Sequence, residues 1–134
     1  MVHQFTLGKT ERLKSRKLTE AVFSNGRKMT VYPYRVFYLM EENPGNIHPP
    51  LQAGVGVSTR NFKKATDRNR VRRLTREAWR LQKMPLAAAL AAHSKRLLLF
   101  MVYSQKELPG FTVVKEKVKA IADKLIVITN ENHS

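Results

Sequence analysis

Residues 61–81 concentrate the side chains that are best suited to chemistry with a polyanion. Residues 60–80 hold nine lysines or arginines against two acids, Asp67 and Glu77. Arginine dominates, and its guanidinium is weakly hydrated and pairs with phosphate through two parallel hydrogen bonds. We therefore predict that this stretch binds nucleic acid. The alternative is a basic helix face that is merely solvated.

The second half of this stretch has the periodicity of one amphipathic helix. Its apolar stripe runs at helical spacing through Val71, Leu74, Ala78 and Leu81. The opposite face carries Asn69, Arg72, Arg73, Arg76 and Arg80. Thr66 is expected to cap the helix, and Asp67 suits its positive first turn. The pattern predicts a helix that packs on a sheet and presents cations to a partner.

The bulk composition indicates one basic globular domain. The 134 residues carry a formal charge of +15, and 43% of them are hydrophobic. A single domain with its own core is therefore expected over residues 1–134. A charge of this size repels itself in a compact fold, so it predicts a neutralising partner, nucleic acid first and an anionic membrane surface second.

Several classes of site are excluded or disfavoured. The chain has no cysteine, which excludes disulfides and thiolate metal sites, and its four histidines are too far apart for a local ligand pair. It has no HExxH, no complete GxxxxGKS or GxxxxGKT phosphate-binding loop, and no complete dinucleotide fingerprint. We therefore expect no catalytic residue and no metal ligand in this chain. Without an apolar span or signal core, a cytoplasmic protein is expected.

The chain on either side of the basic stretch alternates between expected helices and strands. A short helix is expected from its cap Ser15 to the stop signal Asn25-Gly26. Strands are expected at about 28–32, 34–40, 51–58 and 97–103, with a loop at 41–50. The alanine-rich residues 84–93 predict a helical turn or two. The last helix is expected from about Thr112, a possible cap, to 128, with a seam at Val114, Val118, Ile121, Leu125 and Ile128.

Two features leave alternatives open. Gly54 and Gly56 share one face of a strand, so either a helix packs closely there or a ligand approaches, and close packing is favoured. Phe62 and Trp79 either stack on bases or anchor the basic helix, and support is favoured for Trp79. Composition does not separate RNA from DNA, so a helix-turn-helix DNA regulator is also an alternative.

The basic helix resembles a known family signature. The run Arg68-Asn69-Arg70, continuing to Arg80, resembles the RNR helix in the protein component of bacterial ribonuclease P. The strand before it, the connecting segment at 61–67 and the flanking elements are similar too, so the resemblance covers residues 12–128. It implies a two-layer α/β sandwich of order αβββαβα, like a domain of ribosomal proteins, with a rare left-handed βαβ crossover.

The resemblance also implies a function. Such a protein accompanies, one to one, a catalytic RNA that removes the 5′ leader from precursor tRNA, so the holoenzyme is an endoribonuclease whose Mg²⁺ is bound mainly by RNA. The RNA-binding residues expected here are Arg60, Lys63, Lys64, Arg68, Asn69, Arg70, Arg72, Arg73 and Arg76. Phe23, Tyr38, Val57 and Arg60 match positions that line a cleft for the leader. The alternative is a ribosomal-type or chaperone-like RNA-binding protein without a role in catalysis.

Two positions depart from the family pattern. Thr59-Arg60 stands where the family often has two lysines, which removes one cation from the segment ahead of the basic helix. Leu18-Thr19 lies near a position where an aromatic is usual, so one stacking surface is expected to be missing from the first helix.

Overall fold

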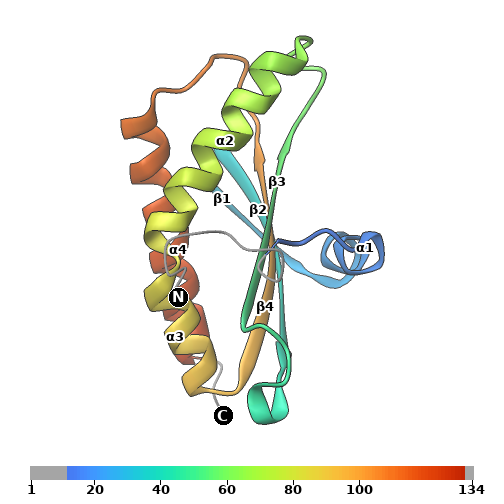
Figure 1. The fold of residues 1–134 in the computed structure, drawn as a ribbon, viewed down its shortest axis with the longest axis vertical. Helices are drawn as coiled ribbons and strands as arrows, with labels where there is room; N and C mark the ends of the chain where they lie inside the picture. The colour runs from blue at the N-terminus through green and yellow to red at the C-terminus, as the bar shows by residue number, and fades with distance from the viewer. Residues whose placement is uncertain (1–11, 132–134) are drawn as a thin grey trace, which may run out of the picture.

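A computed structural model describes residues 12–131 of the chain. The expected N-terminal arm and polar tail lie mostly outside this range, as do His3 and His133. The elements follow in the order α1 (Arg16–Asn25), β1 (Arg27–Val31), β2 (Tyr34–Glu42), the 3-10 turn η2 (Pro44–Asn46), β3 (Leu51–Val57), α2 (Ala65–Gln82), α3 (Met84–Ala92), β4 (Lys95–Tyr103) and α4 (Phe111–Glu131) (Figure 1).

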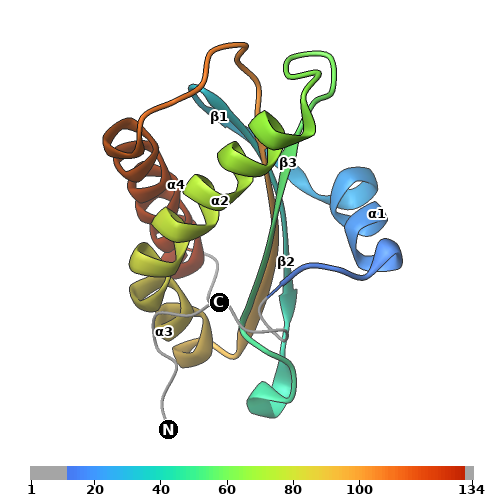
Figure 2. The same ribbon diagram turned by 45° about the horizontal axis from the view of Figure 1, so that its top comes forward.

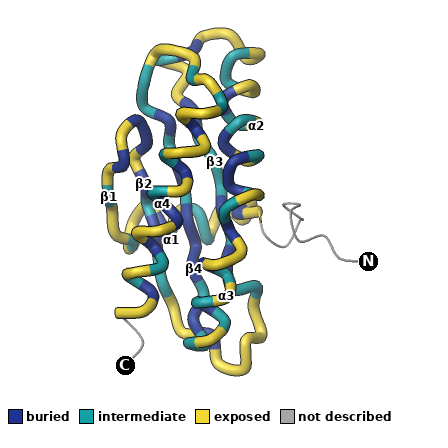
Figure 3. The backbone as a smooth tube through the Cα atoms, turned by 90° about the vertical axis from the view of Figure 1, so that its left-hand side faces the viewer, coloured by how far each residue is buried: buried dark blue, intermediate teal, exposed yellow. Residues whose placement is uncertain are grey.

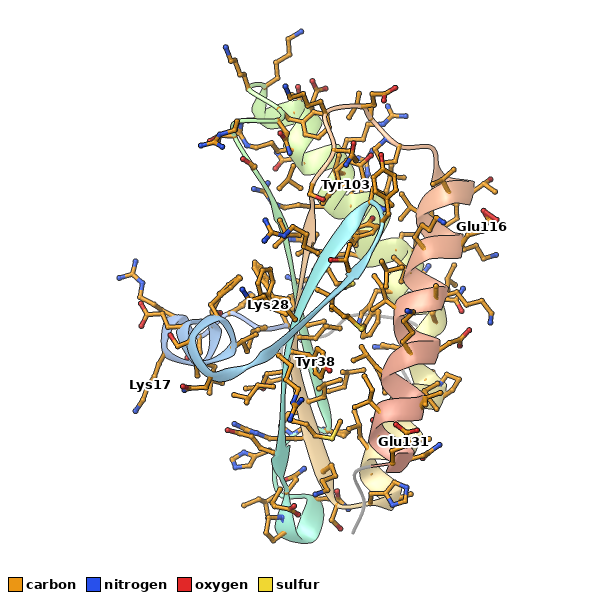
Figure 4. All side chains as sticks on the ribbon, turned by 180° about the vertical axis from the view of Figure 1, so that it is seen from behind. Lys17, Lys28, Tyr38, Tyr103, Glu116 and Glu131 are labelled. Carbon is orange, nitrogen blue, oxygen red and sulfur yellow. The ribbon has the colours of Figure 1, made fainter. Side chains whose placement is uncertain are left out.

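The strands form one mixed sheet in the order β1-β2-β4-β3. The β1–β2 and β2–β4 pairs are antiparallel, and β3 pairs with β4 in parallel. Helices α2, α3 and α4 cover one face of the sheet, whereas α1 lies alone on the other (Figure 2). Figure 4 shows this division through Lys17 of α1 and Glu116 of α4, which project on opposite sides of the molecule. The expected α/β sandwich is confirmed.

The parallel connection from β3 to β4 runs through α2 and α3. Seen from the helix face with β3 running upward, β4 lies to the left of β3 (Figure 3). The crossover is therefore left-handed, as the resemblance implied and against the general right-handed rule. Helix α3 has nine residues rather than a turn or two, and its buried Leu86 and Leu90 join the main core.

The main core lies between the sheet and the three-helix layer. The predicted burial of strand β4 on both faces is confirmed only in part. Its helix side is buried throughout, whereas on the other side only Leu98 is buried and Phe100 and Val102 are half-buried. Leu97, Leu99 and Met101 join the main core, whereas Leu98 packs with Leu13 and Val22 beneath α1. The tube in Figure 3 shows the buried stretches running along β4 and the inner sides of α2 and α4.

The helix ends agree with the predictions in part. Ser15 caps α1, since its Oγ accepts a hydrogen bond of 3.3 Å from the Leu18 amide. The expected caps Thr66 and Thr112 are wrong, because α2 begins at Ala65 and α4 at Phe111, which places both threonines inside first turns. No side chain caps α2 at Lys64.

The stop signal at Gly26 is confirmed, but its physical cause is close approach rather than a left-handed backbone. Gly26 has φ −81°, which other residues adopt readily. A Cβ at this position would lie 2.4 Å from the Val22 carbonyl oxygen and 2.5 Å from the Tyr38 carbonyl oxygen. Only glycine lets the end of α1 turn this tightly against β2.

The buried stripe of α2 is rotated from the predicted one. Val71 and Ala78 are buried as expected, but Leu81 is 39% exposed. Thr75 and Trp79 are buried in its place. A threonine can be buried here because its hydroxyl finds a partner in the sheet, Tyr34, which helical periodicity alone does not reveal.

Candidate nucleic-acid interface

Helix α2 is held against the sheet by a buried polar contact. The Tyr34 hydroxyl of β2 lies 2.6 Å from Oγ1 of Thr75, and both residues are inaccessible to solvent. Burial raises the pKa of Tyr34 from 10.0 to about 12, although the hydrogen bond with Thr75 opposes part of this shift and nearby Tyr103 adds to it. Because the inner side of α2 is fixed in this way, its opposite side faces outward.

The loop ahead of α2 is anchored by Phe62 and Arg68. The Phe62 ring is 5% exposed and stacks on Tyr103 at 6.1 Å between ring centroids. One Arg68 guanidinium nitrogen donates hydrogen bonds of 2.9 Å to the carbonyl oxygens of Phe62 and Lys63. Phe62 and Trp79 are therefore packing anchors in this structure, and Arg68 braces the loop that leads into the helix.

The outward side of α2 carries the cations that are available to bind an external partner. Asn69 Oδ1 accepts a hydrogen bond of 2.9 Å from the Arg72 guanidinium, so the asparagine orients that arginine. Arg70 and Arg73 are exposed, and neither has a hydrogen bond or ion pair among the residues that the structure describes. Arg80 is instead neutralised by an ion pair with Glu77.

The other expected RNA-binding residues extend this surface. Seven of the nine are exposed: Arg60, Lys63, Lys64, Asn69, Arg70, Arg73 and Arg76. Arg68 and Arg72 are half-buried, in keeping with their hydrogen bonds inside the chain. The structure thus places the outward residues of α2 and its leading loop on the solvent side.

A second surface lies on the sheet face beside α1. The Phe23 ring of α1 packs on Phe37 and Phe100 at centroid distances of 4.7 and 5.2 Å, and Phe23 remains 43% exposed. The Arg35 guanidinium lies 5.9 Å from the Phe37 ring centroid. We call these four residues, Phe23, Arg35, Phe37 and Phe100, the open-face cluster.

The two glycines of β3 explain how this cluster fits on the sheet. A Cβ at Gly54 would lie 3.4 Å from the Phe100 ring, and one at Gly56 would lie 3.2 Å from it. Close packing is therefore the correct interpretation of the bare strand face, but an aromatic ring from β4 fills the space rather than a helix.

The four residues expected to line one cleft do not share one surface. Phe23 belongs to the open-face cluster, whereas Tyr38 and Val57 are 8% and 9% exposed and belong to the main core. Successive strand residues point to opposite faces, so Phe37 and Gly56 occupy the open face where Tyr38 and Val57 were expected. The expectation did not include Arg35, Phe37 and Phe100. Strand alternation in residues 34–40 contained the signal for the first two, whereas Phe100 lies in a continuous apolar run that does not reveal its face.

Arg60 lies in the same hollow as Arg35 of the open-face cluster. Both residues line a hollow of about 410 Å³ at the end of the sheet, together with Ser58, Thr59, Asn61, Val102, Tyr103 and Ser104. The Ser58 hydroxyl accepts a hydrogen bond of 3.0 Å from the Arg60 amide, which shapes the turn there. Thr59, which departs from the family pattern, adds a hydroxyl rather than a cation to this hollow.

Neither a metal site nor a membrane span emerges from the described part of the chain. Within residues 12–131 there is no group of three histidine, aspartate or glutamate side chains placed to hold a metal ion. Among the same residues, no helix has the length and apolar character needed to cross a bilayer. The surface of α2 and its leading loop offers arginine and lysine side chains, and the open-face cluster offers aromatic rings beside Arg35.

Comparisons with known proteins identify relatives of this chain. The family model described as Ribonuclease P matches residues 7–126. The ribonuclease P protein component of Porphyromonas gingivalis is 38% identical over 118 residues, which make up 86% of this chain and 82% of that protein. The corresponding component of Chlorobium phaeobacteroides is 24% identical over 128 residues, covering 90% of this chain and 88% of that protein.

Solved structures share the fold. The ribonuclease P protein from Thermotoga maritima aligns with a TM-score of 0.63 and 23% identity, over 85% of this chain and 96% of that one. The protein from Staphylococcus aureus aligns with a TM-score of 0.60 and 16% identity, over 85% of this chain and 94% of that one. Both likenesses concern the arrangement of helices and strands.

Proposed function

Because this chain belongs to the ribonuclease P protein family, we propose that the outward side of α2 binds the RNA component of the holoenzyme and that the open-face cluster holds the single-stranded 5′ leader of precursor tRNA. The chain is a subunit of an endoribonuclease, and catalysis is assigned to the RNA component. In this proposal one protein accompanies one RNA, and the protein binds and orients both polyanions.

The observation that carries the proposal is the arrangement of arginines on a fixed helix. Arg70 and Arg73 are exposed without partners in the described chain, and Arg72 is oriented by Asn69. At about 1.5 Å per residue, the 18 residues of α2 span about 27 Å, enough to meet several phosphates of an RNA backbone. The Arg72 guanidinium, which Asn69 orients, would lose less side-chain freedom on binding phosphate, whereas Arg70 and Arg73 are free to reach it.

The open-face cluster suits a single strand rather than a duplex. The half-exposed Phe23 ring offers a flat apolar surface on which an unpaired base can stack, and such stacking depends little on base identity. Arg35, whose guanidinium lies beside Phe37, and Arg60, which shares a hollow with Arg35, would bind backbone phosphates of the same strand. The open-face cluster would thus bind the 5′ leader with little preference for its base sequence.

The role proposed for Mg²⁺ follows from the family to which the chain belongs. On that ground we assign the ion mainly to the RNA component. When bound there, Mg²⁺ supplies charge stabilisation for hydrolysis of the phosphodiester. The protein, with its formal charge of +15, lowers the repulsion between the catalytic RNA and the precursor tRNA.

The experiment that tests this assignment compares substrates with and without a leader. The reconstituted holoenzyme is titrated with precursor tRNA and with mature tRNA, using the unchanged protein, Phe23→Ala and Arg73→Ala. Phe23→Ala is expected to weaken binding of the precursor only, about 5- to 100-fold for one lost stacking contact. Arg73→Ala is expected to weaken binding of the RNA component. Equal loss for both substrates with Phe23→Ala would refute the leader assignment.

A further inference from the structure

The segment ahead of α1 runs along the outer edge of β3. The Leu13 amide donates a hydrogen bond of 3.0 Å to the Ala53 carbonyl oxygen, and Arg12 forms a parallel bridge with Ala53. Leu13 also packs with Val22 and Leu98 beneath α1. This short pairing brings Arg12 and Lys14 to the strand edge.

A hollow of about 180 Å³ lies at this edge, and we call it the β3-edge notch. It is lined by Arg12, Leu13, Lys14, Ala53, Gly54, Val55, Arg76 and Phe100. Three cations therefore reach it, two from the leading segment and one from α2. Among the described residues that line it, no side chain is a carboxylate. The bare backbone at Gly54 keeps the floor open, since a Cβ there would contact the Leu13 carbonyl oxygen and Phe100 at 3.4 Å.

The electrostatics of the β3-edge notch favour an anion. Partial burial lowers the pKa of Arg76 below the usual arginine value, and the positive charges of Arg12 and then Arg72 lower it further. Arg76 thus lies in the field of two like charges. The repulsion from Arg72 acts within α2, whereas the repulsion from Arg12 acts between α2 and the leading segment. An anion between them would convert the repulsion into attraction.

We propose that the β3-edge notch binds a phosphate group of an RNA backbone, and that this phosphate locks the leading segment onto β3. The identity of the ligand rests on the proposed function, while the notch itself rests on its own residues. The notch shares Phe100 with the open-face cluster, and Arg76 follows Arg72 by one turn of α2. A strand that runs from the outward side of α2 to the open face would cross it, so the notch joins the two binding surfaces.

The test is hydrogen exchange at the Leu13 amide in the full-length chain. Exchange is measured in three samples: the protein without ligand, the protein with a single-stranded oligouridylate, and the protein with inorganic pyrophosphate. We expect exchange to slow about fivefold with the oligouridylate, the scale of one partly exposed ionic contact. Slowing with pyrophosphate as well supports a site for any phosphate, whereas slowing with the oligouridylate alone supports a site for a backbone phosphate. No slowing with either ligand overturns the proposal.

A charge reversal on α2 distinguishes anion binding in the β3-edge notch from nonspecific attraction to a basic protein. Arg76→Glu places a carboxylate beside Arg12, so Leu13 exchange is expected to be slow without any ligand and to gain little from the oligouridylate. Arg76→Gln, which removes the charge with less change in shape, should reduce the ligand effect. Lys124→Glu on the exposed side of α4 makes the same change in net charge and should respond as the unchanged protein does. A full ligand response in Arg76→Glu contradicts the proposal.

Binding of the labelled oligouridylate is followed by fluorescence anisotropy in the same samples. If the oligouridylate binds while Leu13 exchange is unchanged, the inference about the β3-edge notch fails and the proposed function stands. If the oligouridylate does not bind, the proposed function is contradicted. Slowing by pyrophosphate would still support the notch in that case.

Discussion

The hydroxyl of Tyr34 lies 2.6 Å from Oγ1 of Thr75, and this buried hydrogen bond joins the sheet to the helix that carries the arginines. Both residues are fully buried, so water does not replace either partner. Together with the buried Val71, Ala78 and Trp79, the contact fixes the rotation of α2 about its own axis. It thereby decides which arginines face outward.

Removing the Thr75 hydroxyl is expected to destabilise the protein. Thr75→Val leaves the Tyr34 hydroxyl buried without its partner, which costs about 1–3 kcal/mol. Urea unfolding measures the loss. The double variant Tyr34→Phe/Thr75→Val should recover part of it, because no polar atom is then left unpaired. A double variant whose loss equals the sum of the two single losses would show that the pair is not coupled.

Alkaline pH should weaken the fold through Tyr34. Its pKa is about 12 in the folded chain against 10.0 for the ordinary side chain. Above pH 10 the unfolded state loses this proton while the folded state keeps it, so stability falls as pH rises from 10 to 12. The loss reaches about 2–3 kcal/mol by linkage. Unfolding titrations between about pH 9 and pH 12 should show a shallower decline for Tyr34→Phe.

Arg73 and Arg68 should differ in what they contribute. Arg73→Ala is expected to weaken RNA binding and to lower the slope of log K against log salt by about one unit, with unchanged stability. Arg68→Ala removes the two hydrogen bonds to the loop carbonyls, so it should also lower stability by about 1–3 kcal/mol.

Binding isotherms at several salt concentrations and urea unfolding separate these two effects. Lys115→Ala, on the exposed side of α4, serves as a control for the loss of one charge. An unchanged salt slope for Arg73→Ala would place that arginine on a merely solvated surface.

Gly26 and Gly110 form a matched pair. A Cβ at Gly26 would lie within 2.5 Å of two backbone oxygens, whereas a Cβ at Gly110 would have no atom within 4 Å among the described residues. Gly26→Ala should therefore cost about 3 kcal/mol or more, and Gly110→Ala should change stability by less than about 0.5 kcal/mol. Thermal unfolding of the two variants tests this, and similar losses would show that the end of α1 is not tightly held against β2.

Local patterns predicted the elements of this fold well. Period and turn chemistry located both long helices and all four strands, and the hydroxyl at Ser15 located the start of α1. The starts of α2 and α4 were wrong by one or two residues because Ser and Thr are only statistical signals for caps. At α2, the loop before the helix is braced by Arg68, and this contact is invisible in a linear sequence.

The candidate site was less predictable than the fold. The outward arginines of α2 followed from helical period, but the burial of Thr75 depended on Tyr34, 41 residues away. The resemblance implied that Tyr38 and Val57 line the cleft, but both point to the helix side of the sheet and belong to the main core. The exposed face instead holds Phe37 and Gly56, since neighbouring strand residues point in opposite directions.

The most direct test of the central claim is leader removal by a bacterial ribonuclease P RNA at a Mg²⁺ concentration where the RNA alone is nearly inactive. Adding the protein should raise the rate at least about tenfold, equivalent to about 1.4 kcal/mol of barrier. The variant Arg70→Ala/Arg73→Ala should lose most of that gain, while Lys115→Ala should keep it. No gain with the unchanged protein, or an equal gain with the double variant, would contradict the account.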